Sequence, residues 1–354
     1  MAQAPLWTPL HAQVHRTLRR LQLLPKRALL LVAVSGGQDS LCLLRLLLDL
    51  QPKWGWQLGV AHCNHGWRAD AGANAAYVRQ LAATWQLAYH EATASTLFPG
   101  EAEARKWRYQ ALAEIAQIKG YGYVATGHTA SDRAETLLLN LLRGSGADGL
   151  QALAWQRELV PLIQLVRPLL GVMRAETGLF CQQAALTVWE DSTNRESRFA
   201  RNRVRQTLIP YLQTHFNAQV EQALAQTAEL LRSDVEYLEA ATQQLWTEVI
   251  CGAIEPGCSD PAVQEPICGP EHQTLKLNRI ALRAAPIALQ RRVLRRFLQT
   301  LLPAAPTFAQ IEKLMGLLHA PNRSQTDPFP GGAIAQVQQD WIVLWSQGQS
   351  EANS

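Results

Sequence analysis

The segment that most constrains this chain of 354 residues is a short turn between two apolar runs. The first run covers residues 29–34, the turn reads Ser-Gly-Gly-Gln-Asp-Ser over residues 35–40, and a leucine-rich run starts at Leu41. The first run predicts a buried strand, and the second predicts a helix. A strand that passes into a helix through two glycines presents free backbone N–H groups and the positive end of the helix dipole to an anion. The turn therefore predicts a phosphate site.

The acidic residue in this turn separates it from the best-known phosphate loop. The turn lacks the lysine of the G-x-x-x-x-G-K-[ST] loop, so transfer of a γ-phosphoryl group is not expected. Asp39 stands where that loop carries a cation, and a carboxylate repels polyphosphate unless a metal lies between them. We expect either Mg²⁺ at Asp39 together with ATP, or contact between Asp39 and an amine substrate. The alternative is an ordinary glycine-rich turn with an acidic helix cap. The residues expected to bind nucleotide here are Ser35, Gly36, Gly37, Gln38, Asp39 and Ser40.

Strand-like and helix-like runs alternate through the first half of the chain. Strands are expected at 29–34, 58–61 and 121–126, and helices at 10–24, 41–50, 73–86 and 101–119. Strands separated by helices indicate an α/β fold, a Rossmann-like doubly wound parallel sheet with helices on both faces. Ligands of such folds bind beyond the carboxyl ends of the strands. Ser35, His62 and Gly127 are therefore expected to line one crevice.

Polar segments follow the second and third expected strands. Residues 62–68 predict a loop that shapes the nucleotide crevice, with Arg68 near a phosphate or a base, although an ordinary polar turn explains the spacing equally well. Asp132 and Glu135 are three residues apart, so they share one face of a helix. Acidic residues in a first turn often only complement the helix dipole. Their place at the carboxyl edge of the sheet favours a functional role.

Charge, cysteine content and hydropathy limit the class of protein. Lys and Arg number 33 against 29 Asp and Glu, which is too mild an excess to prove an anionic partner. Five arginines between residues 195 and 205 form a basic run, which on its own is usually a solvated face.

Six scattered cysteines without a C-x-x-C pair indicate reduced thiols. No secretory signal or membrane-spanning stretch is visible, so a cytoplasmic protein with no membrane partner is expected.

The turn at residues 35–40 resembles the pyrophosphate-loop ATPases, which adenylate their substrates by cleaving ATP between the α and β phosphates. Other stretches narrow the resemblance to the tRNA(Ile)-lysidine synthase family. They are residues 62–68, 104–109, 127–146, 190–194 and 201–205, and with the turn they occur in the family's order across most of 29–210. One departure is Ser131, where the family usually has an acidic residue.

The resemblance implies a ligase that uses ATP to join L-lysine to carbon 2 of the wobble cytidine in a tRNA(Ile) with a CAU anticodon. The reaction passes through an adenylated cytidine and gives lysidine, AMP and pyrophosphate. Asp132 and Glu135 are implied to bind the lysine amines, one of them assisting deprotonation, while Asp39 holds Mg²⁺ or the incoming amine. Arg201 and Arg205 are implied to offset charge at the α-phosphate.

The remaining site residues also come from the resemblance. His62 and His128 are expected at the nucleotide, and the substrate-binding residues are expected to be Arg68, Arg105, Arg108 and Asn202. The catalytic domain is expected over 1–215, followed by a smaller, mainly helical tRNA-binding domain over 216–350 with a Pro/Gly-rich insertion near 251–270. Four arginines between residues 291 and 296 are further candidates for contact with tRNA backbone.

Two alternatives stay open beside this interpretation. One is a different pyrophosphate-loop enzyme that modifies tRNA, although 2-thiolation would need a cysteine pair that the sequence lacks. The other is a non-catalytic tRNA-binding protein of the same fold, which the presence of Asp39, Asp132 and Glu135 disfavours. A homodimer is compatible with the sequence, which does not determine the oligomeric state.

Overall fold

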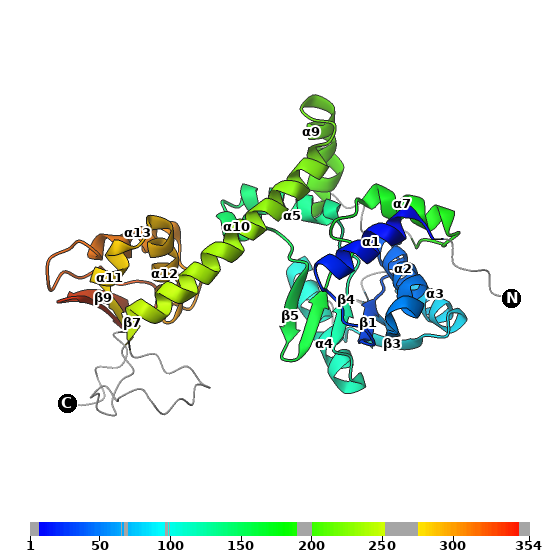
Figure 1. The fold of residues 1–354 in the computed structure, drawn as a ribbon, viewed down its shortest axis with the longest axis horizontal. Coiled ribbons are helices and arrows are strands. Elements are labelled where there is room, and N and C mark those ends of the chain that lie inside the picture. Colours follow the sequence, from blue (N-terminus) through cyan, green and yellow to red (C-terminus); the bar gives the residue numbers. More distant parts are fainter. Residues whose placement is uncertain are drawn as a thin grey trace. The chain divides into compact units, whose positions relative to one another are not determined.

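The computed structural model divides into two compact units, Met1–Arg232 and Ser233–Ser354 (Figure 1). The residues that the structure describes are 7–64, 66, 70–95, 98, 100–189, 200–251 and 275–346. Arg68, the 190–194 motif and nearly all of the 251–270 segment lie outside these residues. Among the described residues, no helix combines the length and the apolar character that a membrane span requires.

The first unit is built on a six-stranded sheet with the order β3-β2-β1-β4-β6-β5. Its strands are β1 (Leu29–Ala33), β2 (Gln57–Asn64), β3 (Ala88–Thr93), β4 (Tyr123–Ala125), β5 (Gln156–Val160) and β6 (Ile163–Val166). All pairs are parallel except β5 with β6. From β1 the chain adds β2 and β3 on one side and β4 and β6 on the other, which makes the β1–β4 junction the topological switch point. The predicted doubly wound fold is confirmed.

Helices lie on both faces of this sheet, with α1 (Pro9–Arg20) and α2 (Gln38–Trp54) on one face and α4 (Glu101–Lys119) on the other. The other helical elements of the first unit are α3 (Ala71–Thr84), α5 (Ala130–Leu142), α6 (Ala147–Leu150), α7 (Arg174–Gln183), α8 (Ala200–Arg203), the π-helical turn η2 (Val204–Leu208) and α9 (Ile209–His215). Successive side chains of a strand point to opposite faces. Leu30 and Val32 of β1 accordingly join the core under α1 and α2, whereas Leu31 joins a second core that includes Leu112 of α4.

The second unit pairs helices with a small antiparallel sheet of order β7-β8-β10-β9. Its strands are β7 (Ile250–Cys251), β8 (Lys276–Asn278), β9 (Ala333–Gln338) and β10 (Trp341–Ser346), and its helices are α11 (Arg279–Ala284), α12 (Ile287–Gln299), α13 (Phe308–Leu317) and most of α10 (Val220–Val249), which begins in the first unit. The sequence interpretation expected a mainly helical domain and missed most of this sheet.

The arginines of α12 are engaged within the second unit. Arg291 pairs with Glu312 at 2.7 Å, and Arg292 pairs with Glu239. Arg296 lies 4.5 Å from the centre of the Trp246 ring and donates a hydrogen bond to Gln243. These contacts tie α12 to α10 and α13, so intramolecular packing accounts for three of the four arginines that were candidates for contact with RNA.

Candidate active site

The turn after β1 is held closed by its own serines. The Ser40 hydroxyl donates to the Gly37 carbonyl at 2.9 Å, and the Ser35 N–H donates to the Ser40 hydroxyl at 3.2 Å. Gly36 has a φ of +88°, in the left-handed region that favours glycine. Gly37 caps α2 without a side-chain hydrogen bond, so the first N–H groups of the helix stay available to an anion.

A neighbouring helix fixes the position of this turn. Asn74 of α3 donates from Nδ2 to the Ser35 carbonyl at 2.9 Å. A Cβ placed on Gly36 would collide with the Asn74 side-chain oxygen, so this close approach requires glycine. The Trp189 N–H donates to the Gly36 carbonyl at 3.0 Å. Neither Asn74 nor Trp189 was identified from the sequence, because a lone amide or indole in a helix or loop carries no chemical pattern.

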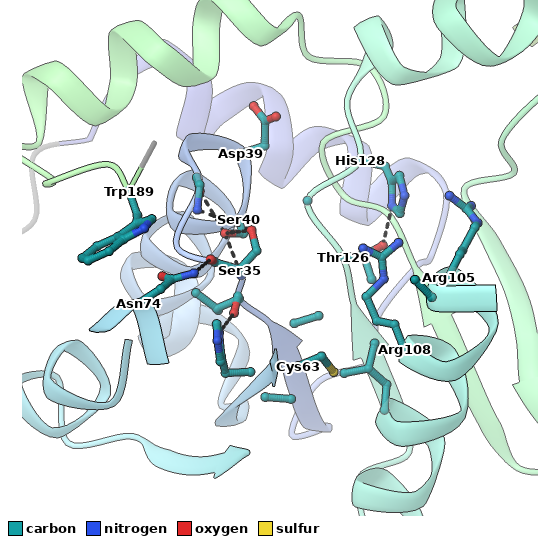
Figure 2. Close-up of a pocket in the computed structure, with 18 of the residues that line it drawn as sticks. Ser35, Asp39, Ser40, Cys63, Asn74, Arg105, Arg108, Thr126, His128 and Trp189 are labelled. Atoms are coloured by element: carbon teal, nitrogen blue, oxygen red, sulfur yellow. Dashed lines mark hydrogen bonds between the residues drawn. The ribbon is translucent and has the colours of Figure 1, made fainter. Parts of the chain in front are cut away.

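A cavity of about 440 Å³ opens at the carboxyl ends of β1, β2 and β4. Figure 2 shows the turn, Asn74 and Trp189 on one side of it, and Thr126, His128, Arg105 and Arg108 on the other. Its walls include most of the expected site residues, namely Ser35, Gly37, Gln38, Asp39, Ser40, His62, Arg105, Arg108, Gly127, His128, Asp132, Arg201, Asn202 and Arg205. Residues more than 160 positions apart in the sequence therefore share one site.

Asp39 faces this cavity while α7 holds its carboxylate. The Thr177 hydroxyl donates to Asp39 Oδ1 at 2.5 Å, and Arg174 Nη1 lies 3.3 Å from Oδ2. Burial raises the pKa of Asp39, although Arg174 and Thr177 act in the opposite direction. Gln38 strengthens the same junction by donating to the Arg174 carbonyl at 2.8 Å. The sequence interpretation missed Arg174 and Thr177, which lie about 135 residues downstream of the turn in a helix of ordinary composition.

Gly127 lets the loop after β4 approach the start of α2. A Cβ on this residue would lie 2.8 Å from the carbonyl carbon and oxygen of Asp39, and 2.9 Å from the Ser40 nitrogen. Real Cβ atoms do not come so close to backbone, so any larger residue must push the loop away from the phosphate turn.

Asp132 caps the start of α5 and also pairs with Arg201 and Arg205. Its Oδ2 accepts hydrogen bonds from the Thr129 N–H at 2.8 Å and from the Thr129 hydroxyl at 2.9 Å. Its Oδ1 accepts from Arg201 at 2.8 Å and from Arg205 at 3.4 Å. Burial alone would raise the pKa of Asp132, but Arg201, His128, the Thr129 N–H and Arg205 outweigh it and lower the pKa to about 2.

Glu135 lies behind Asp132 and is 1 % exposed. Arg201 donates from Nε to Oε2 at 2.8 Å, and Arg205 donates from Nε to Oε1 at 2.5 Å. Asp132, Arg201 and Arg205 line the cavity, whereas Glu135 does not. The structure thus brings the four predicted catalytic residues of this region together, with Glu135 placed to hold the two guanidinium groups.

The two histidines of the site differ in their surroundings. His62 is buried, and its Nδ1 donates to the Val34 carbonyl at 2.8 Å, which fixes the tautomer. His128 Nδ1 lies 2.9 Å from the Thr126 hydroxyl. Burial holds the pKa of His128 well below its ordinary value, although the Asp132 carboxylate opposes this shift. His128 is therefore neutral at pH 7.

Arg105 and Arg108 bring positive charge to the wall formed by α4. Arg105 donates to the Tyr109 hydroxyl at 3.3 Å, and both guanidinium groups lie within 6 Å of the Tyr109 ring centre. Within the described part of the chain neither forms an ion pair with a carboxylate. Burial lowers the pKa of Arg105, which reflects the cost of a desolvated cation. A bound anion would offset that cost, so this wall suits phosphate groups.

The described residues contain no group of three or more His, Cys, Asp or Glu side chains suited to hold a metal ion. This finding does not disfavour Mg²⁺ beside ATP, since Mg²⁺ commonly uses one or two carboxylates together with phosphate oxygens and water. The carboxylate of Asp39 provides a hard oxygen ligand on the cavity wall next to the phosphate turn.

Fold and site together define a PP-loop ATP-binding protein. A PP-loop domain model matches residues 10–212, and a TilS substrate binding domain model matches residues 277–343. A tRNA(Ile)-lysidine synthase from Nostoc sp. is 58% identical over 348 residues, which cover 98% of this chain and 100% of the relative. The chain belongs to the tRNA(Ile)-lysidine synthase family.

More distant relatives agree with this placement. The tRNA(Ile)-lysidine synthase of Synechocystis sp. is 46% identical over 97% of this chain and 99% of its own length. The chloroplastic tRNA(Ile)-lysidine synthase of Zygnema circumcarinatum is 32% identical over 80% of this chain and 74% of its own length. A solved U34-tRNA thiolase from Methanococcus maripaludis superposes with a TM-score of 0.52 at 17% identity, covering 63% of this chain and 77% of the thiolase, which shows a shared fold alone.

Proposed function

We propose that this protein joins L-lysine to carbon 2 of the wobble cytidine in a tRNA(Ile) with a CAU anticodon, using ATP to activate the cytidine. The observation that carries the proposal is the 58% identity to a tRNA(Ile)-lysidine synthase across 98% of the chain. The cavity supports it with a phosphate turn, a carboxylate for an amine or a metal, and several arginines.

The first step needs the α-phosphate of ATP close to the cytidine O2 atom. We infer that the N–H groups at the start of α2 bind phosphate oxygens and that Arg105 and Arg108 neutralise part of the remaining charge. Asp39 is the proposed ligand of Mg²⁺, which, when bound, screens the charge of the phosphates. The cytidine oxygen attacks the α-phosphate and pyrophosphate leaves, giving the adenylated base. Arg201 and Arg205 stabilise the charge that develops there.

The second step replaces AMP by the lysine amine at carbon 2. An unperturbed lysine ammonium has a pKa of about 10.4, so the amine must release a proton to solvent water before it attacks. Asp132 has a pKa of about 2, which makes it a weak base but a persistent anion. We therefore infer that Asp132 binds a lysine ammonium by charge. Glu135 keeps Arg201 and Arg205 aligned from behind.

The proposal is tested with labelled lysine, ATP and two transcripts, a CAU-anticodon tRNA(Ile) and tRNA(Met). We expect label and AMP only with tRNA(Ile). Labelling of neither transcript would overturn the function, and labelling of both would overturn the substrate specificity. A cytoplasmic location and a homodimer are further proposals, which cell fractionation and sedimentation velocity test directly.

A further inference from the structure

The first 38 residues of the chain contain no aspartate or glutamate and five lysines and arginines. At the average frequency of this protein, with 29 acidic residues in 354, a stretch of this length would hold about three. The structure places these cations on α1 and on the turn that leads into β1. Together with Lys53 they form what we name the α1 basic surface, made of Arg16, Arg19, Arg20, Lys26, Arg27 and Lys53.

Packing of α1 leaves Arg16, Arg19 and Arg20 on the solvent side of the helix. Leu10, Val14 and Leu18 occupy the buried face of the helix, where they join the core with α2. All six residues of the α1 basic surface are exposed. The Arg27 N–H donates to the Trp54 carbonyl at 2.9 Å, which brings the turn beside the end of α2 that carries Lys53. An open groove on α1 is lined by Gln13, His15, Arg16, Thr17, Arg19 and Arg20.

Several arginines elsewhere in the protein contact a carboxylate, whereas three exposed cations of the α1 basic surface do not. The arginines that contact a carboxylate include Arg45, Arg79, Arg133, Arg174, Arg201, Arg205, Arg232, Arg291 and Arg292. Within the described part of the chain, Arg16, Lys26 and Arg27 form no ion pair. Lys53 and Arg19 also lower the pKa of His15, after the larger effect of burial, which indicates a locally positive field.

The simplest explanation of the α1 basic surface is that its cations only contact water and complement helix dipoles. This explanation accounts for some of the six residues. Arg19 and Arg20 lie in the last turn of α1, and Lys53 in the last turn of α2, where cations complement the helix dipole. The dipole does not explain Arg16, Lys26 and Arg27. Unpaired cations repel one another, and a polyanion that binds across them relieves that repulsion.

We propose that the α1 basic surface binds the phosphate backbone of the tRNA substrate at a place outside the anticodon stem-loop. The proposal rests on the function proposed above. The anticodon loop must reach the cavity at the carboxyl end of β1, whereas Lys26, Arg27 and Lys53 lie at the end where β1 begins. The five residues of β1 separate these two ends by about 17 Å. Phosphate contacts of this kind orient the RNA without reading its sequence.

The test uses Arg16→Gln, Lys26→Gln and Arg27→Gln, singly and combined, because none of these side chains caps a helix. Affinity is measured by anisotropy against salt concentration for full-length tRNA(Ile), full-length tRNA(Met) and the isolated anticodon stem-loop of tRNA(Ile). For both full-length tRNAs, each substitution should reduce the slope of log Kd against log salt by about 0.7 to 0.9. The combined variant should weaken binding about tenfold or more near 0.1 M salt. Affinity for the stem-loop should stay unchanged.

Lys119→Gln is the matched control, since it removes one exposed cation of the same unit at the end of α4. Unchanged salt slopes in all variants would overturn the proposal, and so would equal losses for full-length tRNA and the stem-loop. Loss of binding to vesicles of anionic phospholipid, with tRNA binding intact, would assign the surface to a membrane instead. Lysine transfer by the unaltered protein is measured alongside, so failure of the proposed function is seen separately.

Discussion

Arg205 donates hydrogen bonds to both carboxylate oxygens of Glu135, from Nε to Oε1 at 2.5 Å and from Nη2 to Oε2 at 2.9 Å. Arg201 reaches the same carboxylate from the preceding helical turn. Two-point pairing of this kind fixes the plane of a guanidinium group as well as its position. The orientation of the cations on the cavity wall therefore depends on a carboxylate that does not itself line the cavity.

Glu135→Gln should reduce activity without removing any group from the cavity wall. The amide keeps the size of the side chain but loses its charge and one acceptor, so Arg201 and Arg205 lose their alignment. We expect kcat to fall by about 10- to 100-fold and the free energy of unfolding to fall by about 2 kcal/mol. Steady-state lysine transfer and urea unfolding measure the two effects. The exposed Glu114→Gln variant on α4 should match the unaltered protein in both.

Asp132→Asn should weaken lysine transfer and leave ATP binding intact. Asparagine keeps an oxygen that can accept the Thr129 cap, but it removes the anion proposed to attract the lysine ammonium. The expected result is an increase in the KM for lysine of about tenfold or more, since a charge-assisted hydrogen bond contributes about 1.5 to 3 kcal/mol. Unaltered lysine transfer would remove Asp132 from the proposed mechanism. Calorimetric titration with an ATP analogue checks that the nucleotide still binds.

The same substitution should change how stability depends on pH. The pKa of Asp132 is about 2 in the folded protein, below its ordinary value of 3.8. Stabilisation from the ionised carboxylate is therefore fully present above pH 4 and is lost as the pH falls through the folded-state pKa. It amounts to about 2 kcal/mol. In urea unfolding, the difference in stability between the unaltered protein and Asp132→Asn should narrow as the pH falls from about 4 to about 2. A constant difference would contradict the lowered pKa.

Gly127→Ala should separate the loop after β4 from the phosphate turn. Its Cβ would meet the backbone of Asp39 and Ser40, which cannot move aside as a flexible side chain does. We expect a loss of about 1–3 kcal/mol in the free energy of unfolding, together with weaker ATP binding. Gly122→Ala provides the control, because a Cβ there has no atom within 4 Å. Equal stability and equal ATP affinity of the two variants would show that the close approach at Gly127 does not affect folding or nucleotide binding.

Local patterns explain which parts of the molecule were predictable. The phosphate turn between β1 and α2 was predictable because glycines, hydroxyls and apolar runs are adjacent in the sequence. Strand β3 was missed because its side chains are mostly half-buried at the sheet edge and do not alternate in polarity. Strands β5 and β6 were also missed, and they are only five and four residues long. The carboxylates of α5 were visible, but their partners on α8 and η2 depend on tertiary folding.

The contacts of Asp39 have a consequence for dissecting this enzyme into parts. A fragment that ended before Arg174 would retain the glycine turn, all six strands of the sheet and the arginines of α4. It would nevertheless lose the hydroxyl and the guanidinium group that restrain Asp39. Such a truncated protein can still bind phosphate groups while the Asp39 side chain lacks the contacts with Thr177 and Arg174. Nucleotide affinity is therefore a poor measure of the shortest fragment that can catalyse the reaction.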